Sequence, residues 1–239
     1  MEKPEESLEK VTDGLGLEIS KSQKEQLLWY IHLLLEGLNR QRLVGEKSGA
    51  ALIEKHLYDS LYPLKLWSFP PGRLLDLGTG AGLPGIPLKI CLPKVKLYLV
   101  DANRRKINFL RRVAAELALS ETYLLPGRAE KWGRDPIYRE KFNCLVSRAV
   151  ARAVILVELA LPLVKIGGDL LMYKGKNGLN EIEEARTAIR LCGGQMEKYW
   201  HYYLPTGEER TLFLIKKTGP TPEAYPRRIG KPAQKPLGL

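Results

Sequence analysis

The 239-residue sequence contains few cysteines and no long apolar run. Its three cysteines, Cys91, Cys144 and Cys192, lie singly with no Cys-x-x-Cys pair, so we expect neither a disulfide framework nor a metal site. No apolar stretch reaches the roughly 18 residues that a membrane-spanning helix requires. The sequence begins MEKPEESLEK, which is acidic where a signal peptide is basic and then apolar. These absences predict a cytoplasmic protein without a membrane anchor.

Positive charge is in excess and unevenly distributed. The net charge is +11 overall, made up of −2 in residues 1–66, +10 in residues 67–218 and +3 in residues 219–239. Such an excess favours a polyanionic partner such as nucleic acid, although it equally suits solubility alone.

The hydrophobic pattern changes character near residue 67. Before it, apolar residues recur at helical spacing, as in Leu27, Ile31, Leu34 and Leu35 behind the expected N-cap Ser20, which predicts a helical N-terminal extension over 1–66. After it, short apolar runs alternate with helical stretches. The expected strands are 74–77, 97–100, 142–146, 170–173 and, more weakly, 123–125; the expected helices are 84–92, 103–118, 153–165 and 179–191. This alternation predicts an α/β domain on a mostly parallel sheet.

The end of the sequence has a different organisation. Residues 199–204 and 211–216 flank the turn-forming PTGEE, which predicts an antiparallel hairpin added to the sheet and places the end of the α/β domain, 67–218, at residue 218. Residues 219–239 contain five prolines and four basic residues with little periodicity. We therefore expect an extended or disordered basic tail, in which Arg227, Arg228, Lys231 and Lys235 are candidates for phosphate contact.

A glycine-rich run, LLDLGTGAGLPG at 74–85, joins the first expected strand to a helix. Glycines allow a tight turn and a close approach of the backbone to a ligand, which makes the loop residues Gly78, Thr79, Gly80 and Gly82 cofactor-binding candidates. Asp101 ends the next strand, KLYLVD, where a carboxylate can accept hydrogen bonds from both ribose hydroxyls of an adenosine-containing cofactor.

The same loop fits two cofactors. Gly80, Gly82 and Gly85 match the G-x-G-x-x-G pattern of nicotinamide-dependent oxidoreductases. Asp76, inside the first strand, instead suits a cofactor that carries a cationic amino group and a sulfonium, because it would repel a pyrophosphate. We therefore expect S-adenosylmethionine and a Rossmann-like class I methyltransferase fold, with Asp76 at the cofactor.

Several motifs in order resemble the ribosomal RNA small subunit methyltransferase G family, also called glucose-inhibited division protein B: KHLYDSL, GTGAGLPGIPL, VDANRRKINFL, GRAEKW, SRAVA and YPRR. The resemblance implies methyl transfer from S-adenosylmethionine to N7 of a guanine in 16S rRNA, with the rRNA or a precursor of the small ribosomal subunit as partner. It also implies a cofactor site lined by Gly78, Leu83, Asp101, Ala129, Glu130 and Arg148. The run Gln41–Val44 departs from the Tyr-Asn-Leu-Thr of many members, which puts a substrate role of that loop in doubt.

Three residues are candidates for the catalytic centre. His56 and Asp59, one helical turn apart, either face the acceptor pocket or form a structural pair, and Arg148 orients either the cofactor or the RNA. Lys174 and the basic face of 104–112 are weaker candidates for RNA contact. An oxidoreductase and a non-catalytic RNA-binding assembly factor on the same fold remain as alternatives.

Overall fold

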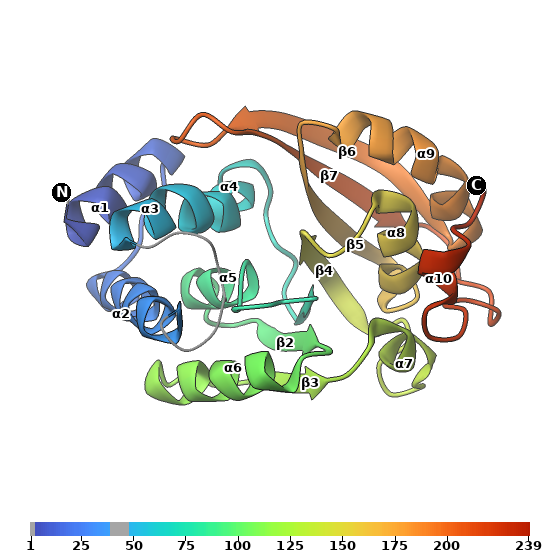
Figure 1. The fold of residues 1–239 in the computed structure, drawn as a ribbon, viewed down its shortest axis with the longest axis horizontal. Helices are drawn as coiled ribbons and strands as arrows, with labels where there is room; N and C mark the ends of the chain where they lie inside the picture. Colours follow the sequence, from blue (N-terminus) through green and yellow to red (C-terminus); the bar gives the residue numbers. More distant parts are fainter. Residues whose placement is uncertain (1–2, 39–47) are drawn as a thin grey trace.

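A computed structural model describes residues 3–38 and 48–239 of the chain, and the predicted departure at 41–44 lies outside these residues. The centre is a seven-stranded sheet with the order β3-β2-β1-β4-β5-β7-β6 (Figure 1). Neighbours within β1 to β5 pair in parallel, whereas β7 pairs antiparallel with both β5 and β6. The predicted α/β fold with a parallel sheet and an antiparallel C-terminal hairpin is therefore confirmed. The strands are β1 (Arg73–Leu77), β2 (Lys96–Asp101), β3 (Thr122–Pro126), β4 (Phe142–Arg148), β5 (Val164–Gly175), β6 (Gly194–Tyr203) and β7 (Glu209–Lys217).

Helices cover both faces of the sheet, because alternate side chains of its buried strands pack into two separate cores. Leu74 and Leu97 enter the first core, whereas their neighbours Leu75 and Tyr98 enter the second. The first core is covered by α1 (Pro4–Leu15), α2 (Lys21–Leu38), α3 (Gly49–Leu52), the π-helical turn η1 (Ile53–Leu57), α4 (Tyr58–Leu66), α5 (Gly85–Cys91) and α6 (Arg104–Glu116). The second is covered by α7 (Ala129–Arg134), α8 (Ala153–Ala160) and α9 (Gly178–Leu191).

The N-terminal helices are attached to the sheet's first core. Ser20 caps α2 as predicted, since its Oγ accepts from the Gln23 amide at 3.2 Å while the Gln23 side chain accepts from the Ser20 amide at 2.8 Å. Within the predicted helical extension, η1 separates α3 from α4 and forms a wider turn of a kind that recurs at functional sites. This turn carries His56.

The C-terminal segment contradicts the expectation of an extended or disordered tail. Residues 219–239 follow the folded domain, form the short helix α10 (Lys231–Gln234) and bury Leu237 in the second core. Figure 1 shows this segment, in red, beside α8 and at the opposite end of the view from α1. Composition alone suggested disorder because the groups that hold the segment, such as Glu158 for Arg227, lie far away in the sequence.

Candidate functional site

Two adjoining cavities open at the carboxyl ends of the parallel strands, where α/β proteins bind ligands. The first is about 630 Å³ and the second about 410 Å³. Gly78, Lys106 and residues 149–151 belong to the walls of both. One ligand can therefore extend from one cavity into the other past the glycine loop and the turn after β4.

The glycine loop after β1 is held in close contact with that turn. The amides of Gly78 and Thr79 donate to the Val100 carbonyl at 2.8 and 3.0 Å. Gly78 has a φ of 71°, and a Cβ on it would clash with Cγ2 of Val150. Gly78, Thr79, Gly80 and Leu83, four of the predicted cofactor-binding residues, lie on the wall of the first cavity.

Two loop candidates lie elsewhere than expected. Asp76 is fully buried behind the loop, where one carboxylate oxygen accepts from Thr79 Oγ1 at 2.7 Å and from the Gly85 amide at 2.8 Å. Burial raises the pKa of this carboxyl from 3.8 to about 6, while the two hydrogen bonds oppose the shift. Gly82 faces the core, since a Cβ there would lie 2.6 Å from Ile86 Cγ1. Both residues shape the loop from behind and are absent from the described walls of the two cavities, so their place at the cofactor stays a prediction.

The second cavity presents carboxylates from two elements. Asp101, at the end of β2, accepts from the Gly80 amide at 2.9 Å and from the Asn103 amide at 2.8 Å. Ala129 and the nearly buried Glu130 come from the first turn of α7. Lys106 and Arg128 lie on the same wall, with Lys106 Nζ 3.9 Å from Asp101. The Asp101 carboxylate at the end of β2 can accept from the hydroxyls of a ribose.

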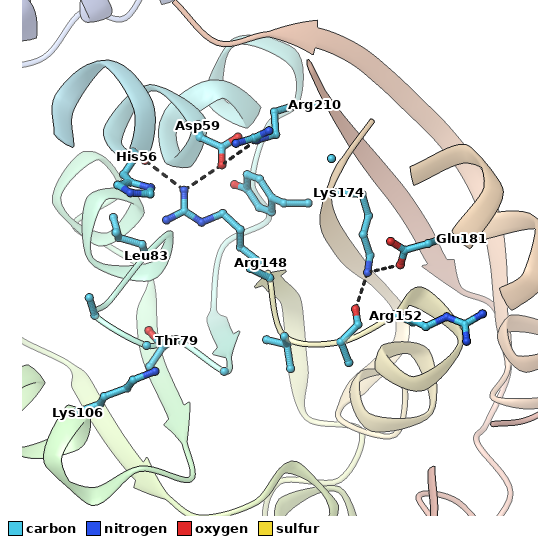
Figure 2. Close-up of a pocket in the computed structure, with 18 residues that line it drawn as sticks. His56, Asp59, Thr79, Leu83, Lys106, Arg148, Arg152, Lys174, Glu181 and Arg210 are labelled. Carbon is cyan, nitrogen blue, oxygen red and sulfur yellow. Dashed lines mark hydrogen bonds and ion pairs between the residues drawn. The ribbon is translucent and has the colours of Figure 1, made fainter. Parts of the chain in front are cut away.

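The first cavity contains the three predicted catalytic candidates (Figure 2). Arg148, the last residue of β4, donates from Nη1 to Asp59 Oδ2 at 2.9 Å and to the His56 carbonyl at 3.4 Å. The structure therefore brings the three together around the Arg148 guanidinium. The π-helical turn η1 and the following first turn of α4 place His56 and Asp59 against the end of β4.

The turn after β4 is fixed by a buried lysine. Lys174 donates to the Ala151 carbonyl at 2.5 Å and to Glu181 Oε2 at 2.8 Å, as Figure 2 shows. Its side chain is only 8% exposed and is paired within the protein, so it is not a solvated surface lysine, and these contacts do not favour its weaker candidacy for RNA contact. Ala149, in the same turn, has a φ of 56°, a strained conformation of the kind that clusters at functional sites.

Comparison with known proteins identifies the family. The family model described as rRNA small subunit methyltransferase G matches residues 23–210. The chain belongs to this family. The chain is 44% identical over 226 residues to Ribosomal RNA small subunit methyltransferase G of Lachnoclostridium phytofermentans, covering 94% of this chain and 93% of that one. It is 41% identical to the protein of the same name from Pelotomaculum thermopropionicum, with 97% and 98% covered.

The fold is also that of solved structures outside the methyltransferase G family. TrmN from Thermus thermophilus superposes with a TM-score of 0.53 at 19% identity, covering 67% of this chain and 48% of that one. No described helix is long and apolar enough to cross a membrane. Within residues 3–38 and 48–239, no cluster of His, Cys, Asp and Glu is arranged to hold a metal ion.

Sequence reasoning about this methyltransferase G chain missed two residues beside Asp59: Tyr202 is buried behind it, and Arg210 lies on the wall of the first cavity. Tyr202 of β6 donates to Asp59 Oδ1 at 2.5 Å, and its ring stacks on Tyr62 with centroids 3.7 Å apart. Burial and the adjacent Asp59 charge raise the pKa of the Tyr202 hydroxyl, so it stays protonated as a donor. Arg210 of β7 lies 4.0 Å from the same carboxylate. No local motif marks either residue, because both reach the site through the antiparallel hairpin.

Proposed function

We propose that the chain transfers the methyl group of S-adenosylmethionine to N7 of a guanine in 16S rRNA, in the cytoplasm. The observation that carries this proposal is the pair of adjoining cavities, one lined by ribose-binding carboxylates and one by the cluster of Arg148, Asp59 and His56. Family membership supports the methyl transfer and disfavours a nicotinamide-dependent oxidoreductase. In this proposal residues 67–218 form the catalytic domain, and the helical extension 1–66 supplies His56 and Asp59.

The residues that would hold the cofactor lie on the walls of both cavities. When bound, S-adenosylmethionine supplies an electrophilic methyl group on a cationic sulfur. Asp101 would accept from the ribose hydroxyls, Ala129 and Glu130 would hold the adenine end, and Gly78, Thr79, Gly80 and Leu83 would line the route towards the first cavity. Asp76 acts indirectly, because its hydrogen bonds with Thr79 and Gly85 position the glycine loop.

The acceptor chemistry is inferred from what the first cavity provides. Guanine N7 has a free in-plane lone pair and no proton, so its methylation needs no general base. Asp59 accepts from Arg148 and Tyr202, which commits both of its oxygens to positioning. Cys144, the nucleophile that a cytosine C5 reaction would need, is buried, and burial raises the pKa of its thiol well above the ordinary value. These groups favour an acceptor that attacks unaided.

The residues of the first cavity then act by placing the guanine. Correct alignment of two reacting groups can supply about 7–11 kcal/mol of the barrier. We assign Arg148, His56 and Asp59 to this alignment. The major groove of an RNA helix is deep and narrow, so the target N7 is reached in an irregular region or after the base is flipped out. A cavity of about 630 Å³ at the strand ends has room for such a base.

A map of 7-methylguanine in 16S rRNA from cells with and without this protein tests the proposal. We expect one site to lose its methyl group in the cells that lack the protein and to regain it when the gene is restored. An unchanged map would contradict the proposal and favour the alternative of a non-catalytic assembly factor. Restoration with an Arg148→Ala variant is expected to fail.

A further inference from the structure

The C-terminal segment reaches the second cavity. Gly230, Pro232 and Ala233 lie on its wall together with Asp101 and Glu130. The Gly230 amide donates to Glu130 Oε1 at 3.0 Å. The same carboxylate therefore faces the cavity and holds the segment that closes it.

A buried ion pair fixes the segment just before this contact. Glu158 of α8 is fully buried, and it accepts from the Arg227 amide at 2.9 Å, from Nε at 2.8 Å and from Nη2 at 2.5 Å. Arg227 also donates to the Lys235 carbonyl at 2.7 Å, beyond the cavity residues. An arginine that is committed to a buried carboxylate on one side and to its own segment on the other is a structural anchor. It is not available to RNA phosphate.

Further anchors act upstream. Arg139 donates to the carbonyls of Thr221 and Tyr225, each at 2.7 Å, and Arg134 donates to the Pro226 carbonyl at 2.7 Å. Gly133 permits the close approach of Pro226, since a Cβ on it would lie 2.8 Å from the proline Cγ. Arg134 and Arg139 thus hold the segment through its backbone carbonyls, and the segment's own Arg227 fixes it to Glu158.

We propose that residues 225–234, the C-terminal strap, form the adenine end of the cofactor site, and that the strap and the cofactor stabilise each other. This inference rests on the proposed function. The ribose-binding Asp101 and the strap share the second cavity, whereas the candidate acceptor residues line the first. The part of the cofactor that lies beyond the ribose and away from the acceptor is the adenine. Because binding linkage is reciprocal, cofactor that contacts the strap must also reduce its opening.

Calorimetric titration of full-length variants with S-adenosylmethionine tests the first half of the proposal. Ala233 is exposed on the cavity wall, so Ala233→Trp places an indole in the space of the ligand and leaves the anchors in place; we expect its Kd to rise by roughly tenfold or more through steric exclusion. Ala224→Trp makes the same change at an exposed position of the segment outside the cavity wall and is expected to bind like the wild type. Thermal unfolding of both variants shows whether they fold equally well.

Amide hydrogen exchange of the wild type tests the second half. We expect exchange at residues 227–234 to slow when S-adenosylmethionine is added, while exchange at residues 205–208, in the distant hairpin turn, stays unchanged. The inference would be overturned if Ala233→Trp, Ala224→Trp and wild type had equal Kd values. It would also be overturned if amide exchange in the strap were the same with and without S-adenosylmethionine. Wild-type protein that does not bind S-adenosylmethionine would instead overturn the proposed function, so the two failures are distinguishable.

Discussion

The guanidinium of Arg148 lies 2.9 Å from the carboxylate of Asp59, and the two side chains are only 13% and 4% exposed. Their positive and negative charges therefore compensate each other at the wall of the first cavity. This matters because the proposed cofactor carries a cationic sulfur, which an uncompensated arginine would repel. The ion pair lets an arginine orient ligands without weakening the binding of a sulfonium.

Asp59→Asn is expected to weaken S-adenosylmethionine binding more than S-adenosylhomocysteine binding, because only the former carries the sulfonium charge. At an effective dielectric constant near 20, the repulsion between the unpaired Arg148 charge and the sulfonium is about 1–2 kcal/mol. This energy corresponds to a change of roughly five- to thirtyfold in the ratio of the two Kd values. Calorimetry with both ligands measures that ratio. Tyr202→Phe, which removes a neutral donor to the same carboxylate, is the matched control and should leave the ratio unchanged. A ratio that stays constant in Asp59→Asn would refute the compensation.

Asp101→Ala should weaken S-adenosylmethionine binding by about 1.5–3 kcal/mol, the usual contribution of hydrogen bonds to a charged group. The variant also removes the acceptor for the Gly80 amide, so urea unfolding must accompany the titration. Asp135→Ala, at the C-terminus of α7 and outside both cavity walls, is the control. Wild-type affinity in a folded Asp101→Ala protein would remove this residue from the cofactor site.

Gly78→Ala should lower the free energy of unfolding by about 2–4 kcal/mol, since the new Cβ meets Val150 and the backbone has a positive φ. Gly80→Ala also has a positive φ, but its Cβ meets no atom closer than 3.8 Å, so only the backbone cost of about 1–2 kcal/mol applies. Adding Val150→Ala should recover part of the loss at Gly78 and none at Gly80. Equal losses in the two single variants would show that the contact with Val150 is unimportant.

The buried Asp76 predicts a specific pH dependence of stability. Its pKa is raised from 3.8 to about 6 in the folded protein, so the folded state binds the proton more tightly than the unfolded state. The resulting stabilisation is fully present below pH 4 and is lost as the pH rises through 6, a change of about 3 kcal/mol. Urea unfolding of wild type and Asp76→Asn measures their free energies of unfolding between pH 4 and 7. As the pH rises over this range, the difference between the two free energies should shift by about that amount in favour of the variant. A difference that is constant with pH would contradict the raised pKa.

Local patterns predicted the parts of the site that lie close together in the sequence. The glycine loop and Asp101 follow directly from two neighbouring strands whose carboxyl ends must meet at one edge of the sheet. The direction in which Asp76 and Gly82 face could not be predicted, because it depends on Tyr30 and α5 packing behind the loop. The same limit applies to Asp59 with Tyr202, which join through the hairpin, and to Arg227 with Glu158. Composition was misleading for the C-terminal segment because its ordering comes from distant charged partners.

Single-turnover methyl transfer with labelled S-adenosylmethionine and small ribosomal subunits from cells that lack the protein tests the central claim most directly. The label should appear in 7-methylguanine of the 16S rRNA, at a rate that is nearly constant from pH 7 to 9, because N7 does not titrate in that range and no general base is needed. His56→Ala and Cys144→Ser should retain part of this activity. Label in an exocyclic amine or a ribose would contradict direct attack by N7. So would a pH-dependent wild-type rate, if one of these substitutions lowers the rate about 10⁴-fold and abolishes that pH dependence.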